Sequence, residues 1–146
     1  MNSFDAAIET IHEHAMGAYV TDSICLCDEL KDRKVYLSGA ITNKKNYKGL
    51  FLFAERIAKS CDASRIFNPA RQIPTNLDYW SAMRRCIASL VGCDTIVMLP
   101  GWNKSRGAKM EYDIAVFCGI DVCDFEKNPV VKSFYCDLEK ELKRLL

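Results

Sequence analysis

Hydrophobic positions along the chain follow two alternating patterns from residue 34 onward. Short apolar runs, bounded by turn-forming residues, predict strands at 34–40, 64–70, 94–100 and 120–125. Between and after these runs, apolar residues spaced three or four apart predict helices at 47–61, 77–93, 105–119 and 130–146. The chain therefore repeats a strand-then-helix unit over most of its length.

The character of these elements predicts how they assemble. The run DTIVMLP at 94–100 is apolar on both faces, as expected of a central strand in a parallel sheet that helices cover on each side. Pro69 should stop the preceding strand, and Gly119 is placed to cap the helix at 105–119. We therefore predict a single-domain α/β fold, with a Rossmann-like (flavodoxin-like) parallel sheet flanked by helices and joined by right-handed crossovers.

The pattern before residue 34 is of a different kind. Apolar spacing at 4–16 predicts an amphipathic helix, whereas 17–33 mixes turn-forming residues with a short apolar piece and leaves its structure open. We interpret 1–33 as an N-terminal helical extension and 34–146 as the α/β domain. The first residues carry acids and no basic region, which is unlike a signal peptide, and no apolar run approaches the ~20 residues of a membrane span.

Composition narrows the function classes. The 146 residues suit one domain, 49% of them are hydrophobic, and the net charge is only +1. We therefore do not expect the broad basic field that binds polymeric nucleic acid. The eight cysteines come without an export signal or zinc-ligand spacing, so we expect small buried side chains and no metal. A cytoplasmic protein without a membrane partner follows as the expectation.

Polar loops directly follow three of the predicted strands, at 38–46, 68–76 and 100–108. In parallel α/β sheets, ligands bind outside the carboxyl ends of the strands, so the functional surface should lie where these loops meet. Ser38 and Gly39 begin the first loop, and Gly39 permits close approach of a ligand. Neither a GxGxxG nor a Walker pattern is present, and an ordinary strand-to-helix turn is the alternative interpretation.

The third loop is more distinctive. Ser105 stands at an N-cap position and Gly107 permits close approach, so the helix start offers backbone N–H groups to an anion. Arg106 could add a bidentate contact to phosphate. Glu111 lies under two turns after Ser105, so it either faces the strand ends or is an ordinary solvated helix residue.

Four motifs together resemble the nucleoside 2′-deoxyribosyltransferase superfamily in their order and spacing. They are VYLSGAIT at 35–42, FNPA at 67–70, CDTIVMLPGW at 93–102 and SRGAKMEYDIA at 105–115. The resemblance is strongest to a branch of unknown function from phages and bacteria. It runs from about residue 34 to residue 123.

The resemblance implies that Glu111 is a catalytic nucleophile. Members of the superfamily attack the anomeric carbon of a nucleoside or nucleotide and displace the base, and water or a second base then resolves the glycosyl-enzyme ester. A carboxylate in this role divides one difficult displacement into two easier steps. By the same resemblance, Tyr36 would hold the carboxylate, while Ser38, Ser105 and Arg106 would contact a 5′-phosphate. No metal or organic cofactor is implied.

Aromatic and amide side chains near the strand ends are further candidates for the substrate site. Trp102 is placed to stack on a nucleobase, a contact worth ~1–3 kcal/mol. Asn68 could touch the ligand, or it could be a turn residue before Pro69. For Trp80, at a helix start, we expect core packing or a subunit contact instead.

One position departs from the superfamily pattern. Many relatives carry an aspartate eight residues before the position of Asp94, and this chain has Cys86 there. A neutral thiol does not replace a carboxylate in proton transfer without strong activation. Asp78 and Asp94 remain as alternative acids, and the departure leaves the base-release step and the substrate class open.

The sequence therefore supports more than one function. The first is N-glycosidic bond cleavage of a nucleoside 5′-monophosphate or a nucleoside, by hydrolysis or by deoxyribosyl transfer. The alternative is a non-catalytic nucleotide-binding sensor or binding module on the same fold, and the third is a structural protein with an idle pocket. The resemblance also implies a homodimer or higher homo-oligomer. The amphipathic segments 4–16 and 130–146 either contribute to that assembly or pack on their own sheet.

Overall fold

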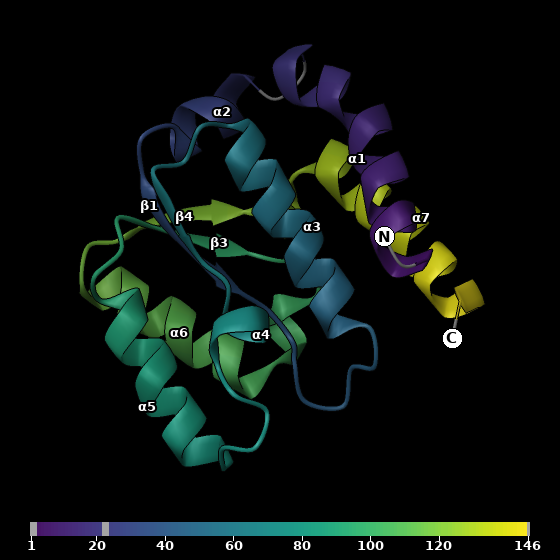
Figure 1. Cartoon of the computed structure of the whole chain (residues 1–146). Coiled ribbons are helices and arrows are strands. Elements are labelled where there is room, and N and C mark those ends of the chain that lie inside the picture. Colours follow the sequence, from purple (N-terminus) through teal and green to yellow (C-terminus); the bar gives the residue numbers. More distant parts are fainter. Residues whose placement is uncertain (1–2, 22–23, 146) are drawn as a thin grey trace.

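The four predicted strands pair into one parallel sheet with the order β2-β1-β3-β4 (Figure 1). The computed structural model describes residues 3–21 and 24–145. The strands are β1 (Lys34–Ser38), β2 (Arg65–Phe67), β3 (Thr95–Met98) and β4 (Asp121–Asp124). The sheet is flanked by helices, so the predicted Rossmann-like (flavodoxin-like) α/β fold is confirmed.

The connecting elements lie close to the predicted ranges, with some short additions. The helices are α1 (Ser3–Thr21), α2 (Ile24–Leu30), α3 (Tyr47–Ser60), α4 (Pro69–Gln72), α5 (Tyr79–Leu90), α6 (Arg106–Phe117) and α7 (Pro129–Leu145), and the 3-10 turns are η1 (Trp102–Lys104) and η2 (Phe125–Lys127). The sequence pattern did not predict α4 or the two 3-10 turns, because each is about one turn long and has no apolar period to detect. Pro69 does end the second strand segment, and it occupies the first position of α4.

Gly119 ends α6 as predicted. Its backbone has a φ of 70°, a left-handed conformation that glycine adopts without strain. The amide of Ile120 donates to the carbonyl of Ala115 at 2.9 Å, and the amide of Gly119 donates to the carbonyl of Val116 at 3.2 Å. These bonds satisfy carbonyls that the end of a helix otherwise leaves without partners.

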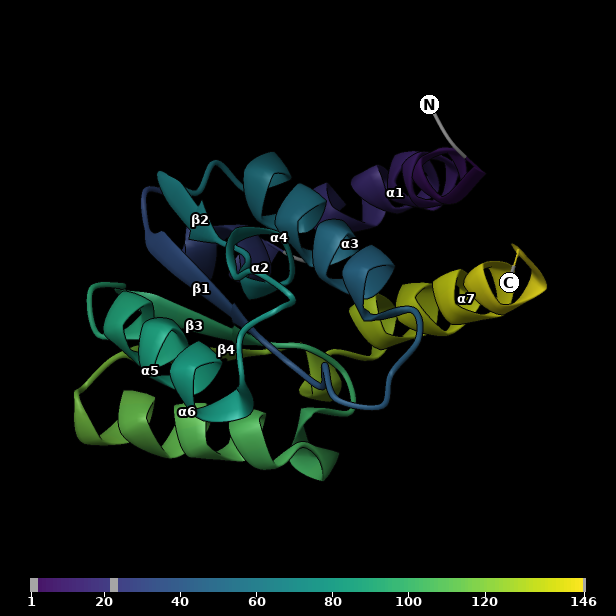
Figure 2. The ribbon, with the colours of Figure 1, turned by 60° about the horizontal axis from the view of Figure 1, so that its bottom comes forward.

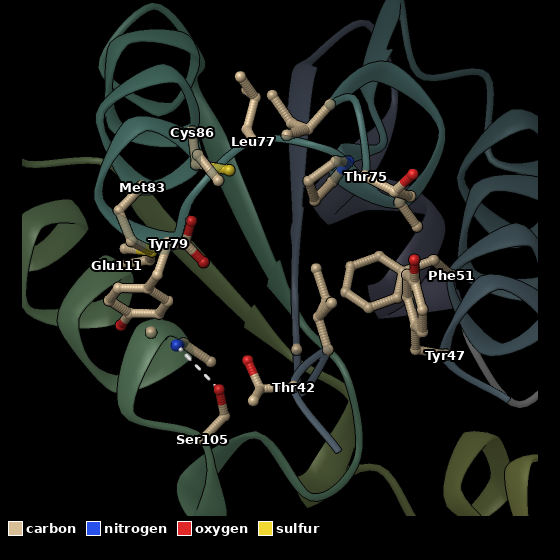
Figure 3. A pocket seen from close by; sticks show the side chains of 18 of the residues that line it. Thr42, Tyr47, Phe51, Thr75, Leu77, Tyr79, Met83, Cys86, Ser105 and Glu111 are labelled. Atoms are coloured by element: carbon tan, nitrogen blue, oxygen red, sulfur yellow. Dashed lines mark hydrogen bonds between the residues drawn. The ribbon is translucent and has the colours of Figure 1, made fainter. Parts of the chain in front are cut away.

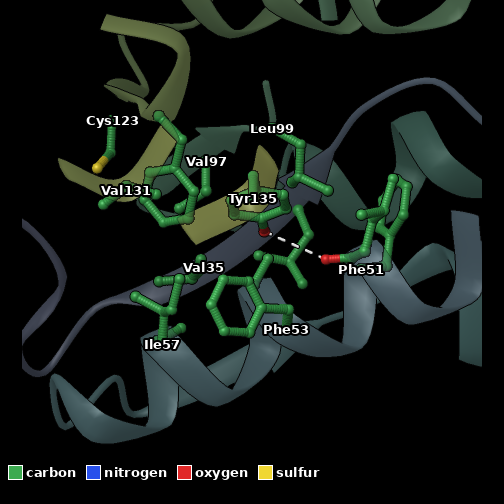
Figure 4. Close-up of a cluster of buried hydrophobic side chains, with 14 of the residues drawn as sticks. Val35, Phe51, Phe53, Ile57, Val97, Leu99, Cys123, Val131 and Tyr135 are labelled. Atoms are coloured by element: carbon green, nitrogen blue, oxygen red, sulfur yellow. Dashed lines mark hydrogen bonds between the residues drawn. The ribbon is translucent and has the colours of Figure 1, made fainter. Parts of the chain in front are cut away.

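Side chains alternate across each strand, and this alternation divides the core into two clusters. On one face, Val35, Leu37 and Val97 pack against α3 and α7, as Figure 4 shows for part of the cluster. The hydroxyl of Tyr135 on α7 donates to the carbonyl of Leu50 on α3 at 3.1 Å, which ties the two helices together. Helices α1, α3 and α7 lie together on this side of the sheet (Figure 2).

On the opposite face, α5 and α6 pack against β1 and β3 (Figure 2). The strand residues pointing there include Tyr36, Ile96 and Met98. Helix α6 turns the small, buried side chains of Ala108 and Ala115 toward the sheet. Because alanine has little bulk, the backbone of α6 can approach the strands closely, which brings its other inward residue near β1.

The N-terminal segment joins the main core. Ile8 of α1 and Leu30 of α2 are buried in the cluster beneath α3, and α1 lies against α3 and α7. The helix predicted at 4–16 is present and continues to Thr21, and α2 occupies part of the segment left open at 17–33. Residues 22–23 of that segment lie outside the described residues. Helices α1 and α7 thus bury apolar side chains on their own domain.

The cysteines do not all follow the prediction of burial. Cys61, Cys86 and Cys123 are buried, but Cys118 and Cys136 are exposed, so the prediction is wrong for these two. Cys118 caps the end of α6, and Cys136 lies on the outer side of α7, where apolar spacing does not require burial. Within the part of the chain that the structure describes, no helix combines the length and apolar character needed to cross a membrane.

Candidate functional site

A cavity of about 360 Å³ opens beside the carboxyl ends of β1 and β3 (Figure 3). Glu111, Met83 and Tyr79 line one side of it, and Tyr47 and Phe51 of α3 line the opposite side. All three loops that follow the strands contribute to its lining. Their lining residues are Gly39, Ile41 and Thr42 from the first loop, Pro69, Ala70, Ile73, Pro74, Thr75 and Leu77 from the second loop and α4, and Ser105, with Gly107 and Ala108 just inside α6, from the third.

The Glu111 carboxyl group is held by two hydroxyl donors on β1. The Tyr36 hydroxyl donates to Oε2, and the Ser38 hydroxyl donates to Oε1 at 2.7 Å. Tyr36 and Ser38 are two residues apart on one strand, so they point to the same face of the sheet. Glu111 lies on the inward face of α6, in helical register with Ala108 and Ala115. The local geometry of one strand and one helix therefore brings the three groups together.

Burial dominates the electrostatics of this cluster. Glu111 is only 6% exposed, and the loss of hydration raises the pKa of its carboxyl group to about 7. The hydrogen bonds from Tyr36 and Ser38 act in the opposite direction, because they stabilise the ionised form. Burial, followed by the negative charge of Glu111, raises the pKa of Tyr36 well above its ordinary value, so its hydroxyl stays a donor.

Cys86, which stands where the resemblance would place an acid, also lines the cavity. Burial raises the pKa of its thiol, with a smaller opposing effect from its hydrogen bond with Tyr36, so the thiol is neutral at physiological pH. The two alternative acids do not line the cavity. Asp78 caps α5 by accepting from the Ser81 amide at 2.9 Å, and Asp94 accepts from the Lys34 amide at 2.9 Å, at the far end of β1.

Close packing surrounds the start of α6. Ser105 is the N-cap, as predicted, and its hydroxyl accepts from the Ala108 amide at 3.2 Å. At Gly107, an added Cβ would lie 3.3 Å from the Met83 sulfur, so glycine lets α5 and α6 approach here. At Gly39, an added Cβ would lie only 3.0 Å from the Cβ of Leu99, closer than side chains normally pack.

Five of the predicted site residues do not line the cavity. Tyr36 and Ser38 are fully buried on β1 and reach the site only through Glu111. The other three have different partners. Trp102 stacks on Tyr112 with ring centroids 4.9 Å apart, and its indole nitrogen donates to Asp124 at 3.1 Å. Asn68 is buried and caps α4 by accepting from the Ala70 amide. Arg106 is exposed, with its guanidinium carbon 5.7 Å from the centre of the Trp80 ring.

Other residues of the cavity had not been singled out from the sequence. They are mainly apolar or aromatic side chains from the first and second loops, α3 and α5, including Ile41, Tyr47, Phe51, Ile73, Leu77, Tyr79 and Met83. A sequence signal existed for two of them, since Tyr47 and Tyr79 begin helices directly after polar loops. The remainder read as ordinary core residues, because apolar spacing alone does not separate a helix's core face from a cavity wall.

The cavity lining contains one carboxyl group, that of Glu111. Among the side chains that the structure describes, no group of three or more His, Cys, Asp or Glu residues is arranged to hold a metal ion. The cavity presents one oriented carboxyl group, Glu111, with neighbouring hydroxyl groups.

Comparison with known proteins identifies the family. The family model described as Domain of unknown function (DUF4406) matches residues 33–124. No curated protein and no solved structure matches the chain significantly. The matched region begins just before β1 and ends with β4, so it contains the whole sheet, Glu111 and both of its hydroxyl donors. Because the match covers more than half of the sequence, the chain belongs to the DUF4406 family.

Proposed function

We propose that this protein cleaves the N-glycosidic bond of a nucleoside or a nucleoside 5′-monophosphate, with Glu111 as the nucleophile. The observation that carries the proposal is the Glu111 carboxyl group, which lines the cavity and accepts one hydroxyl hydrogen bond on each oxygen. The resemblance of the surrounding motifs to nucleoside 2′-deoxyribosyltransferases supports the same role.

The reaction has two steps that pass through Glu111. First, a carboxylate oxygen bonds to the anomeric carbon while the carbon–nitrogen bond breaks; the base leaves with the electron pair and takes up a proton from solvent. Second, a water oxygen attacks the same carbon, the ester bond breaks, and the water loses a proton, which frees the sugar and restores Glu111. A second base in place of water gives transfer. Positive charge develops on the sugar in both steps, and the nearby carboxylate stabilises it.

Tyr36 and Ser38 are positioning residues in this proposal. Each donates to a different oxygen of Glu111, so together they restrict rotation of the carboxyl group. Both bonds also favour the ionised form, which is the nucleophilic one. Because the pKa of Glu111 is about 7, the ionised fraction rises as the pH increases through neutrality. The first step should therefore be faster at mildly alkaline pH than at mildly acidic pH.

A non-catalytic nucleotide-binding module is the second candidate. The observation in its favour is Cys86, a neutral thiol on the cavity wall where the superfamily pattern has an acid. Without that acid, the departing base has no protein group assigned to protonate it. Both candidates predict a bound ligand, but only the first predicts free base.

Base release distinguishes the two candidates. The protein is incubated with common nucleosides and their 5′-monophosphates, and free base is measured by chromatography. We expect release by the wild type and by Glu141→Gln, a matched change at an exposed ion pair of α7, but not by Glu111→Gln. Ligand binding with no base released by any of the three proteins would contradict catalysis and favour the binding module.

We also propose that the protein forms a homo-oligomer, and the exposed apolar surface of α5 and α6 supports this. Among the described residues, the exposed large hydrophobic side chains all lie on these helices or the cap of α5: Tyr79, Trp80, Val91, Met110, Val116 and Phe117. Core packing, one of two expectations for Trp80, is wrong, since its side chain is 57% exposed.

A further inference from the structure

The charge distribution around the cavity bears on which form of the ligand enters it. The cavity lining contains one acidic side chain, Glu111, and five hydroxyl groups, from Thr42, Tyr47, Thr75, Tyr79 and Ser105. Apart from the neutral thiol of Cys86, the other lining residues described are apolar or glycine, and none is lysine, arginine or histidine. An anion that enters this cavity therefore meets a carboxyl group and no compensating cation on its walls.

Several cations adjacent to the lining in sequence are directed toward other partners. Lys44 lies 3.6 Å from Glu139 of α7, and Arg71 lies 2.5 Å from the buried carboxylate of Glu55 on α3. Arg106 is exposed and stands over the ring of Trp80. Moving Arg71 to the cavity would leave the buried carboxylate of Glu55 with only Lys59, 3.8 Å away, which is costly.

The start of α6 is the feature most favourable to a phosphate, and it is partly occupied. A helix N-terminus offers unpaired amides and a partial positive charge. Here the Ser105 hydroxyl already accepts from the Ala108 amide. Glu111, little more than one turn further along the same helix, adds a full negative charge when ionised, which opposes the weaker attraction of the helix end.

We infer that the cavity takes the neutral nucleoside in preference to its 5′-monophosphate, an inference that rests on the proposed function. A neutral ligand fits a wall of hydroxyls and apolar groups without loss of phosphate hydration. It also places no negative charge near the carboxylate that must be ionised to react. As the sugar becomes positively charged in the reaction, the single carboxylate then matches the charge that develops.

The test compares matched ligands. Binding of each common nucleoside and its 5′-monophosphate is measured by ligand-observed NMR and thermal shift with the wild type and Glu111→Gln, and base release is measured with the wild type. For the wild type we expect the monophosphate to bind at least about tenfold more weakly than the matched nucleoside, because like charges are brought together. The difference should shrink in Glu111→Gln, which lacks the carboxylate charge.

A gain-of-charge variant provides an independent check. Thr42→Lys adds an ammonium group to the cavity wall, and Thr10→Lys adds the same group on α1, away from the cavity. We expect Thr42→Lys to raise the affinity for the monophosphate several-fold relative to that for the matched nucleoside, whereas Thr10→Lys leaves this ratio unchanged.

The possible outcomes distinguish a failure of the neutral-ligand inference from a failure of the proposed function. Equal or tighter binding of the monophosphate, or its faster hydrolysis, would overturn the neutral-ligand inference while leaving glycosidic cleavage in place. Selective nucleoside binding without base release would support the inference and contradict the cleavage reaction. Binding of neither ligand class would overturn both.

Discussion

Glu111 is a carboxyl group for which burial and hydrogen bonding act in opposite directions. Loss of hydration favours the protonated form, while the hydroxyls of Tyr36 and Ser38 favour the ionised form. The resulting pKa of about 7 leaves both forms populated near neutral pH. Such a group can change protonation state during a reaction, which is typical of side chains at functional sites.

The first prediction concerns the hydroxyl of Tyr36. Tyr36→Phe removes a donor to Glu111, so the pKa of Glu111 should rise above about 7 and the acidic limb of the pH–rate profile should move to higher pH. We expect base release near pH 7 to fall about 10- to 100-fold, the effect of losing one hydrogen bond to a charged group. Measuring base release across pH 5–9 gives both the fall in rate and the shift of the profile. Circular dichroism shows whether the fold is intact.

Tyr112→Phe serves as the control for this change. Tyr112 follows Glu111 on α6, but its ring stacks on Trp102 and does not line the cavity. An unchanged pH profile in Tyr36→Phe, with the fold intact, would contradict the positioning role of the hydroxyl.

The second prediction concerns stability against pH. The pKa of Glu111 is about 7 in the fold, above its ordinary value of 4.5, so the folded state binds an extra proton between these pH values. The contribution of Glu111 to the free energy of unfolding is therefore fully present below pH 4.5 and is lost as the pH rises through 7. The total loss should be about 3 kcal/mol. Glu111→Gln lacks this loss.

Urea unfolding at several pH values between 4.5 and 8 measures the effect. The free energy of unfolding of Glu111→Gln should increase relative to that of the wild type as the pH rises. This difference should level off above pH 7. Glu141→Gln, a change at an exposed ion pair on α7, should follow the wild type. A constant difference between Glu111→Gln and the wild type would show that the carboxyl group is not perturbed.

Helix α6 is the element that brings the site together. Its inward alanines allow close contact with the sheet, its N-cap Ser105 and Gly107 form part of the cavity, and Glu111 follows just over one turn from its start. The position of the carboxyl group therefore depends on how the first turn of this helix is held. The N-cap and the candidate nucleophile therefore lie in the same few residues, 105–111.

The third prediction separates the cap from general stability. Ser105→Ala removes the acceptor for the Ala108 amide, and Asn128→Ala removes the acceptor for the Val130 and Val131 amides of α7. Each variant should lose about 1 kcal/mol of stability. Only Ser105→Ala should also reduce base release, because only its helix carries Glu111.

Denaturant unfolding and the base-release assay check this pair. Equal losses of activity in the two variants would indicate that reduced stability, rather than the local geometry of α6, controls the reaction.

The molecule as a whole places its two core clusters on opposite faces of the sheet and its cavity at one end. Helices α1, α3 and α7 cover one face, and α5 and α6 cover the other (Figure 2). The two coverings differ in their outer surfaces, since the exposed large hydrophobic side chains of the described residues lie on the α5–α6 side. We expect the proposed contact between copies on that side, where exposed apolar side chains extend from Tyr79, at the cavity, to Phe117 at the far end of α6.

The fourth prediction tests this surface. Phe117 is 92% exposed, so Phe117→Lys should leave the fold intact and shift the protein toward the monomer by placing a charge in the apolar contact. Light scattering after size-exclusion chromatography measures the mass. Lys143→Glu on α7 is the control and should keep the wild-type mass. A wild-type protein that is monomeric at high concentration would contradict the proposed contact.

The sequence by itself determined the order of strands and helices along the chain and the residues that cap α6. Strand runs and helical spacing are local properties, because each depends on which neighbouring residues share a face, so the α/β fold and the cap at Gly119 could be predicted. The N-cap role of Ser105 was equally local. The pairing of Tyr36 with Glu111 came instead from the resemblance to a known superfamily, and the structure contains that contact.

The tertiary structure alone decided which residues surround the carboxyl group. Tyr47 and Phe51 come from α3 on one face of the sheet, and Met83 comes from α5 on the other. The spacing of apolar residues within each helix does not show that the two helices line one cavity. The same packing turns Trp102 toward Tyr112 and Asp124 instead of the cavity. The pKa of Glu111 belongs to this level too, because hydration depends on the burial that distant segments provide together.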